Sequence, residues 1–252
     1  MRFVATADTD IGTTKDTNQD SAMIKHAMTE AGEVLMAVVC DGMGGLSNGE
    51  LASATVIRAF SVWFDEELPV ELEHVNMQIV GLKWSNMLKD LNQKILQYGS
   101  RYGSMGTTFS GILFIGNEYL IVHVGDTRIY QIGKSMVQLT EDQTFVAREI
   151  RNGNMTEEQA KKDRRRNMLL QCVGASKRVD PQIITGRTER GVYMICSDGF
   201  RHEVSAGELY QYLNPANFGD KQVMHGNARY LIDLVKSRRE RDNISVVLIK
   251  VD

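Results

Sequence analysis

Four aspartates lie next to long apolar runs, which places a carboxylate at one end of each predicted buried strand. They are Asp41, Asp126, Asp198 and Asp242, beside the runs 35–40, 119–124, 192–196 and 244–251. Apolar runs of this length, rich in β-branched residues, are typical of strands buried on both faces. Glycine stands next to three of the four aspartates, and its missing side chain lets the backbone come close to a bound group.

Carboxylates gathered in one place repel one another, and each is costly to bury in its ionised form. A divalent cation removes both problems, because Mg²⁺, Mn²⁺ and Ca²⁺ prefer oxygen ligands. Aspartate also favours turns after strands, so this simpler explanation stays open for any single one of the four. The set as a whole predicts a metal site.

The composition is that of a folded protein without a nucleic-acid or membrane partner. Of the 252 residues, 42% are hydrophobic and 24% charged, and 29 basic against 32 acidic side chains give a net charge of −3. A small negative net charge does not indicate a protein that binds nucleic acid. No apolar run reaches the roughly 18 residues of a membrane helix. The cysteines Cys40, Cys172 and Cys196 lie far apart, as expected in a reducing cytoplasm. His123 is expected to be a core histidine with satisfied hydrogen bonds.

Strands and helices are predicted in separate blocks along the chain. The predicted strands are 2–9, 21–26, 34–40, 107–115, 118–124, 128–132, 182–188, 191–196 and 244–251, and the predicted helices are 51–68, 71–98, 140–150, 205–213 and 228–236. We expect 107–132 to form three antiparallel strands on tight turns, 182–196 to form a strand pair, and the helix 71–98 to continue or to break near Gly81. This order favours an α+β fold with two antiparallel sheets face to face and helices outside, in one domain over residues 1–252.

Seven short motifs resemble those of the metal-dependent protein phosphatase family, the protein phosphatase 2C type, in its compact bacterial form. They are Gly12-x-x-Lys15-x-x-Asn18-Gln19-Asp20-Ser21, Asp41-Gly42-Met43-Gly44-Gly45 with Gly49-Glu50, Met105-Gly106-Thr107-Thr108, Val124-Gly125-Asp126-Thr127-Arg128, Leu139-Thr140-x-Asp142, Ser197-Asp198-Gly199 and Asp242-Asn243-Ile244-Ser245. Each motif alone is a weak signal, whereas seven in the family's order across the chain are specific. The resemblance implies a four-layer sandwich with a flap subdomain at about 143–180, and a binuclear Mg²⁺ or Mn²⁺ centre at one end.

The resemblance also implies which residues hold the ions. Asp41 would bridge two ions and the carbonyl of Gly42 would bind one of them, while Asp198 and Asp242 complete the other site. Asp126 matches the aspartate that is linked in bacterial members to a third, weaker ion beside Asp198.

Two further positions match residues that support the ions. Asp20 matches a carboxylate that contacts the first ion directly or through water. Asn243 would orient ligands from behind, as partners of metal ligands commonly do.

The implied activity is hydrolysis of phosphoserine and phosphothreonine in proteins. Two cations lower the pKa of a bridging water, and the hydroxide attacks phosphorus in line, without a phosphoenzyme. The implied partners are phosphorylated proteins made by a Ser/Thr kinase, and the protein is expected to be a cytoplasmic monomer.

Three departures from the family pattern leave questions open. Lys15 stands where the family has an arginine that grips the phosphate, so we expect weaker phosphate affinity. It could instead be an ordinary loop lysine in solvent. Gln19 and Met43 replace a glutamate and a histidine of eukaryotic relatives.

The basic cluster 161–166 falls in the predicted flap, where it either steers substrates or is a plain solvated face. The alternative function is a non-catalytic pseudophosphatase that binds a partner.

Overall fold

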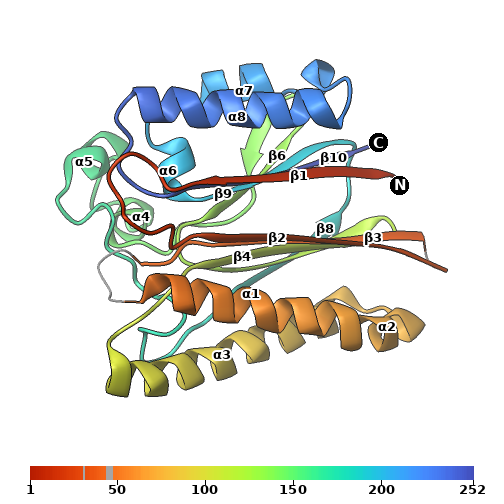
Figure 1. The fold of residues 1–252 in the computed structure, drawn as a ribbon, viewed down its shortest axis with the longest axis horizontal. Coiled ribbons are helices and arrows are strands. Elements are labelled where there is room, and N and C mark those ends of the chain that lie inside the picture. The colour runs from red at the N-terminus through yellow and green to blue at the C-terminus, as the bar shows by residue number, and fades with distance from the viewer. Residues whose placement is uncertain (31, 44–47) are drawn as a thin grey trace.

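Two five-stranded antiparallel sheets lie face to face, and each is covered on its outer side by helices (Figure 1). The structure is a computed structural model that describes residues 1–30, 32–43 and 48–252. The predicted α+β sandwich with its four layers is confirmed. Gly44 and Gly45 of the second motif lie outside the described residues.

The strands of each sheet come from distant parts of the chain. The first sheet consists, in order, of β1 (Phe3–Asp10), β10 (Ile244–Val251), β9 (Gly191–Cys196), β6 (Arg128–Ile132) and β7 (Met136–Gln138). The second consists of β2 (Ser21–Thr29), β3 (Gly32–Cys40), β4 (Phe109–Ile115), β5 (Glu118–Val124) and β8 (Gln182–Arg187). Because the other sheet covers one face of β10, β3 and β4 and helices cover the other, each of these strands needs apolar residues on both faces.

The alternation of side chains along β3 shows why its apolar run is continuous. Leu35, Ala37 and Val39 point into the core between the two sheets. Met36 and Val38 point to the other side, into the core beneath the helices. Successive residues of a strand face opposite sides, so a strand with a core on each side is apolar throughout.

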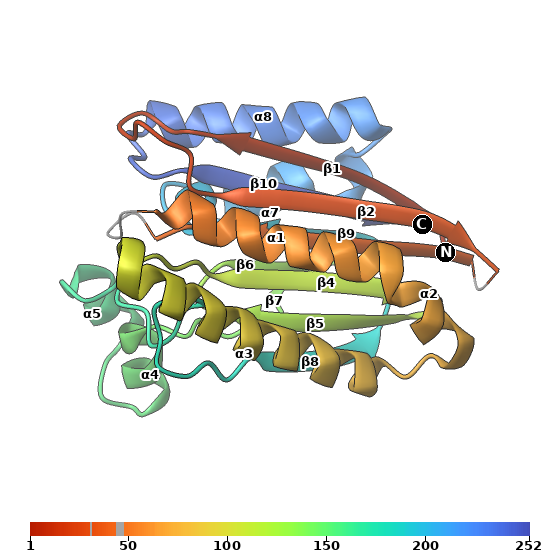
Figure 2. The same cartoon turned by 60° about the horizontal axis from the view of Figure 1, so that its bottom comes forward.

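Two long helices cover the second sheet and one long helix with a shorter one covers the first (Figures 1 and 2). The helices over the second sheet are α1 (Gly49–Glu66) and α3 (Met77–Tyr102), and those over the first are α7 (Ala206–Leu213) and α8 (Lys221–Ser237). The short helices are α2 (Leu68–Glu71), η1 (Leu72–His74), α4 (Phe145–Arg151), α5 (Glu157–Lys162), α6 (Asp198–Arg201) and η2 (Pro215–Asn217). None of the helices in the described ranges is long and apolar enough to cross a lipid bilayer.

The possible helix break near Gly81 does not occur, because α3 runs through this residue. A Cβ atom at Gly81 would lie 2.7 Å from Ile183 Cγ2 and 2.9 Å from Leu120 Cδ1. Glycine in a helix interior costs up to about 1 kcal/mol relative to alanine, but here it lets the helix approach the sheet closely. Gly81 therefore allows close packing of the helix on the sheet and does not interrupt the helix.

The expected strand pairings were wrong in two places. The strands β5 and β6 do not form a hairpin, because β5 pairs with β4 and β8 whereas β6 pairs with β7 and β9. The strands β8 and β9 also belong to different sheets. The turn at Gly125, where φ is +111°, carries the chain from one sheet to the other. Local strand patterns do not determine which strands pair.

The helix boundaries follow the capping side chains. Ser205 and Glu208 form a capping box at the start of α7, as the predicted helix 205–213 requires. Helix α8 begins earlier than predicted, because the side chain of Asp220 accepts hydrogen bonds from the amides of Gln222 and Val223. Helix α4 begins later than predicted, after the cap Thr144.

Candidate active site

The five predicted acidic residues gather at one end of the sandwich, opposite the two termini (Figure 1). Asp20 precedes β2, Asp41 follows β3, Asp126 lies between β5 and β6, Asp198 begins α6, and Asp242 precedes β10. Burial, then the negative charges of the other four, raise the pKa of Asp41 well above its usual value. The fold therefore brings together carboxylates that are more than 200 residues apart in the sequence.

Asp20 is buried, and both of its carboxylate oxygens lack a hydrogen bond among the described residues. Burial, opposed by Ser245 and Ser197 and reinforced by the charges of Asp198 and Asp242, raises its pKa to about 7. Neither oxygen of Asp20 has a hydrogen-bond partner with good geometry within the described chain. The two serine hydroxyls nearby have other contacts as well, since Ser245 Oγ lies 2.9 Å from Thr9 Oγ1 and Ser197 Oγ accepts from the Ser245 amide at 2.9 Å.

One oxygen of Asp198, Oδ1, is also buried without a hydrogen-bond partner in the described residues. Together with the two oxygens of Asp20 it makes three buried carboxylate oxygens without a hydrogen bond among the described residues. Such groups cost free energy unless something binds them. A cation is the ligand that a cluster of negative oxygens fits.

Close backbone packing positions Asp41 and Asp242. A Cβ atom at Gly42 would lie 2.4 Å from the carbonyl oxygen of Gln19, so only glycine allows the two loops to touch. Gly12 has a φ of +80°, and a Cβ atom on it would lie 2.2 Å from the carbonyl oxygen of Asp242, so glycine is needed here too. Gly12 and Gly42 therefore serve loop contact around the acidic cluster.

Asn243 fixes the loop 11–20 beside Asp242. Its Oδ1 accepts a hydrogen bond from the Gln19 amide at 2.9 Å, and its Nδ2 donates to the carbonyls of Ile11 and Thr17 at 2.9 and 3.2 Å. Both donors and the oxygen of the amide therefore hold this loop against the start of β10. The predicted supporting role of Asn243 is compatible with this position and stays a prediction.

The threonine motif holds the backbone of Asp41. The Asp41 amide donates to Thr108 Oγ1 at 2.9 Å, while its carbonyl accepts from Thr107 Oγ1 at 3.0 Å and from the Thr108 amide at 2.9 Å. Thr108 Oγ1 is also 2.6 Å from Thr127 Oγ1, next to Asp126. One hydroxyl therefore connects the loops that carry Asp41 and Asp126, a function that the motif alone did not reveal.

Lys15 points into the acidic cluster and is not an ordinary solvent-exposed loop lysine. Its Nζ atom lies 2.8 Å from Asp242 Oδ1. Burial alone would lower the pKa of Lys15, but the hydrogen bond and charge of Asp242 and the charges of Asp41 and Asp198 raise it above its usual value. The lysine is therefore a resident positive charge of the cluster.

Sequence reasoning missed a second resident cation, Arg201, at the end of α6. Its Nη2 atom donates to the Asp126 carbonyl at 3.3 Å and lies 3.9 Å from Asp126 Oδ2. Burial, with the charge of Asp198, raises the pKa of Asp126 to about 7 despite the opposing charge of Arg201. The available signal was the position of an arginine three residues after Asp198 in the same short helix.

Glu240 was also missed, and it shapes the turn before Asp242. Its Oε1 accepts hydrogen bonds from the amides of Arg241 and Asp242 at 2.7 and 2.9 Å.

His123 is the core histidine with satisfied hydrogen bonds that was predicted. Its ring nitrogens lie 2.8 Å from Ser110 Oγ and 3.1 Å from the Glu141 carbonyl, and burial lowers its pKa to about 4.

The carboxylates are near one another without forming a finished ligand shell. Within residues 1–30, 32–43 and 48–252, no three acidic, histidine or cysteine side chains stand close enough to hold an ion in their present positions. The predicted ligand roles of Asp20, Asp41, Gly42, Asp126, Asp198 and Asp242 thus stay predictions.

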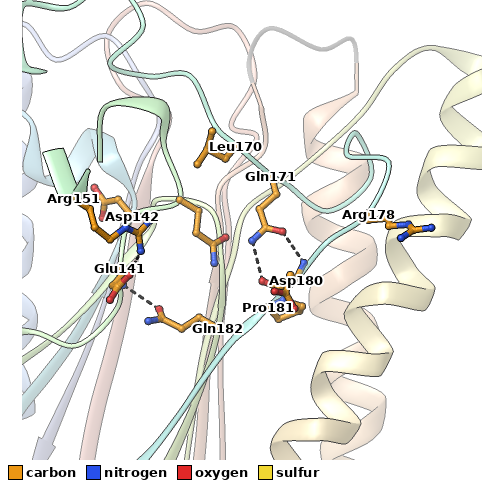
Figure 3. A pocket seen from close by; sticks show the side chains of 10 residues that line it. Glu141, Asp142, Arg151, Leu170, Gln171, Arg178, Asp180, Pro181 and Gln182 are labelled. Atoms are coloured by element: carbon orange, nitrogen blue, oxygen red, sulfur yellow. Dashed lines mark hydrogen bonds and ion pairs between the residues drawn. The ribbon is translucent and has the colours of Figure 1, made fainter. Parts of the chain in front are cut away.

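A cavity of about 470 Å³ lies beside this cluster, between α4 and the segment that leads to β8 (Figure 3). Its polar groups largely bind one another. Gln171 and Asp180 exchange two side chain–backbone hydrogen bonds, at 2.9 and 2.7 Å, and Glu141 pairs with Arg151 at 2.6 Å. Asp142 also lines the cavity and leads towards Arg201. The cavity therefore adjoins the acidic cluster but is not the place where its carboxylates meet.

One arginine of the basic cluster 161–166 is bound within the flap. Arg165 forms a two-point contact with Asp163, at 3.0 and 2.8 Å, and its guanidinium lies 4.0 Å from the centre of the Phe145 ring. These contacts fold the segment after α5 onto α4. Arg165 thus serves the flap's own structure, and a role in steering stays open for the other charges of the cluster.

Comparisons with known proteins agree with the fold and the motifs. The family profile described as protein phosphatase 2C matches residues 13–229. Protein phosphatase PhpP of Streptococcus pneumoniae is 30% identical over 250 residues, which cover 97% of this chain and 96% of PhpP. The structure of serine/threonine phosphatase Stp1 from Staphylococcus aureus has a TM-score of 0.87 at 28% identity, covering 100% of this chain and 96% of Stp1. The catalytic domain of the phosphatase PstP, solved in complex with two manganese ions, has a TM-score of 0.79 at 27% identity, with 99% of both chains covered.

The chain therefore belongs to the protein phosphatase 2C family. Within that family it is a serine/threonine protein phosphatase of the bacterial type, as the seven motifs indicated.

Proposed function

We propose that this phosphatase hydrolyses phosphoserine and phosphothreonine in proteins with the help of two Mg²⁺ or Mn²⁺ ions held by its acidic cluster. The observation that carries the proposal is the set of three buried carboxylate oxygens, on Asp20 and Asp198, that lack a donor in the described chain. The two manganese ions in the PstP structure support it.

The residues present fit two divalent ions. The charges of the other four carboxylates all raise the pKa of Asp41, so we assign it the bridging position. The Gly42 carbonyl and Asp20, directly or through water, serve one ion, and Asp198 and Asp242 serve the other. When bound, such a pair of ions lowers the pKa of a water molecule and supplies the nucleophile for in-line attack at phosphorus.

The protein's own groups prepare this chemistry before any ion binds. The threonine pair fixes the Asp41 backbone, and Asn243 fixes the loop with Lys15. An ion at Asp242 would take over the carboxylate that Lys15 now contacts at 2.8 Å. The freed ammonium would then bind the substrate phosphate, as a point charge without the two-point grip of arginine.

The substrates on this proposal are phosphorylated proteins, and the natural source of such groups is a Ser/Thr protein kinase. The protein is proposed to act as a monomer. A pseudophosphatase that only binds a partner would use the same fold without turnover.

Hydrolysis by the metal-free and Mn²⁺-loaded protein tests the proposal. We expect Mn²⁺-dependent release of phosphate from p-nitrophenyl phosphate and from a phosphothreonine peptide, lost in Asp41→Asn and Asp198→Asn. Asp65→Asn is the matched control, because Asp65 is a half-exposed partner of Lys25 on α1, away from the cluster. Binding of Mn²⁺ without turnover on either compound would favour the binding module instead.

A further inference from the structure

Arg201 is a buried, permanent positive charge next to Asp126. Its side chain is 12% exposed, and a guanidinium stays protonated in proteins. A buried charge without a counterion costs several kcal/mol. The fold must therefore supply Arg201 with a carboxylate.

Two carboxylates lie near Arg201, but one of them already has a partner. Asp142 Oδ2 is 4.0 Å away, yet Asp142 forms a two-point pair with Arg128 at 2.7 and 2.6 Å. That pair is neutral by itself, and the charge of Arg128 holds the pKa of Asp142 below its usual value against the effect of burial. The counterion left for Arg201 is Asp126, whose Oδ2 is 3.9 Å away.

With Asp126 ionised, the charges of these four side chains sum to zero without a further cation. The negative charge of Asp198 also acts on Asp126, but the proposed function assigns Asp198 to one of the two ions at Asp41. A divalent ion at Asp126 would stand within a few ångströms of the guanidinium, in a site where water screens little. The divalent ion and the guanidinium would repel each other, which disfavours binding of the ion. The residues present therefore do not fit the third ion that the resemblance implies for Asp126.

We propose that Arg201 serves as the resident cation of Asp126, so that the protein binds two divalent ions and no third one at Asp126. The inference rests on the proposed function for the two ions at Asp41. It makes Arg201 a positioning residue, which holds the turn between β5 and β6 against α6 through the Asp126 carbonyl and carboxylate.

Equilibrium dialysis of the metal-stripped protein against saturating Mn²⁺, with the bound metal counted by elemental analysis, tests the inference. We expect two ions per chain in the wild type and the same two in Asp126→Asn. Arg201→Gln should gain a third, weaker ion, which Arg201→Gln/Asp126→Asn should lose again. Arg201→Lys keeps the charge and should stay at two.

A wild type that binds three ions, and that loses one in Asp126→Asn, would overturn the inference. Two ions in folded Arg201→Gln, as judged by circular dichroism, would also overturn it. Should Arg201→Gln fail to fold, the wild type and Asp126→Asn decide between the outcomes by themselves. Fewer than two ions in the wild type would overturn the proposed function and this inference together, whereas three ions count against the inference alone.

Discussion

Two acidic clusters of this protein differ in how their charges are balanced. On β1, Asp8 and Asp10 face α8, where Arg229 lies 2.8 Å from Asp8 Oδ1 and Lys236 lies 2.9 Å from Asp10 Oδ2. At the end of the sandwich, five carboxylates meet two resident cations, and three of their oxygens have no hydrogen bond in the described residues. On β1 one oxygen, Asp8 Oδ2, also has no hydrogen bond there, but it lies 3.3 Å from His225 Nδ1.

The difference separates carboxylates that the fold pairs with cations from carboxylates to which we assign the proposed ions. Where a carboxylate is structural, a neighbouring helix supplies its cation, and the pKa of Asp10 lies below its usual value because Lys236, Gly12 and Arg229 outweigh its burial. In the site cluster, burial and mutual repulsion raise the pKa of Asp20, Asp41 and Asp126 instead. The cations of the proposed function would offset this repulsion.

The sharpest difference should appear in catalysis. Asp41→Asn and Asp198→Asn remove groups assigned to the ions, and we expect kcat/KM on p-nitrophenyl phosphate to fall by about 10³-fold or more, or ~4 kcal/mol in the barrier. The same substitutions should not destabilise the metal-free protein at pH 8, because they relieve repulsion. Activity retained within tenfold would place these residues outside the chemistry.

The next effect is on stability, and its sign depends on pH. The pKa of Asp20 is about 7 in the fold against 3.8 as the ordinary value, so the folded state binds the proton more tightly. Its favourable contribution is complete below about pH 4 and is lost as the pH rises through 7. Asp20→Asn should therefore stabilise the metal-free protein at pH 8 by on the order of a few kcal/mol, and little at pH 4.

Urea unfolding of metal-free Asp20→Asn and wild type at both pH values measures this difference. Mn²⁺ should reverse the order at pH 8, since the wild type keeps its ion and the variant loses one carboxylate ligand. A variant that is less stable than the wild type at pH 8 without metal would mean that Asp20 already has a partner.

A smaller effect is expected at Lys15. Lys15→Met should raise KM for phosphopeptides by about tenfold, because one charge-assisted contact to phosphate is lost. Lys15→Arg should keep or lower KM through its two-point grip. Steady-state kinetics of both variants check this. An unchanged KM in Lys15→Met would mean that the lysine pairs with Asp242 and does not bind the phosphate.

The smallest effect is predicted for the paired cluster on β1. Lys236→Met breaks a partly exposed ion pair, so the free energy of unfolding should fall by no more than about 1 kcal/mol. Phosphatase activity should not change. Thermal unfolding measures the loss, and a strong dependence of the variant's stability on Mn²⁺ beyond that of the wild type would contradict the separation of the two clusters.

Much of the fold could be predicted because local patterns determine individual strands. The apolar runs of β3, β9 and β10 are continuous since each strand has a core on both faces. Pairing could not be predicted from the same runs, because the chain changes sheets at Gly125 and again between β8 and β9. Such crossings depend on contacts between distant segments.

The acidic cluster was predictable residue by residue, but its balance of charge was not. Aspartates beside glycines stand out in a sequence, and their positions at the strand ends follow from the strands. Arg201 gives no such signal, since it sits in a helix of four residues and acts across the site on Asp126. The contact of Lys15 with Asp242 likewise joins residues 227 positions apart.

Anomalous diffraction from crystals soaked in Mn²⁺ tests the central claim most directly. The account predicts two manganese peaks that share Asp41 as a ligand, with Asp198 and Asp242 at one of them and Lys15 displaced from Asp242. No peak among these carboxylates, or a single peak away from Asp41, would contradict it.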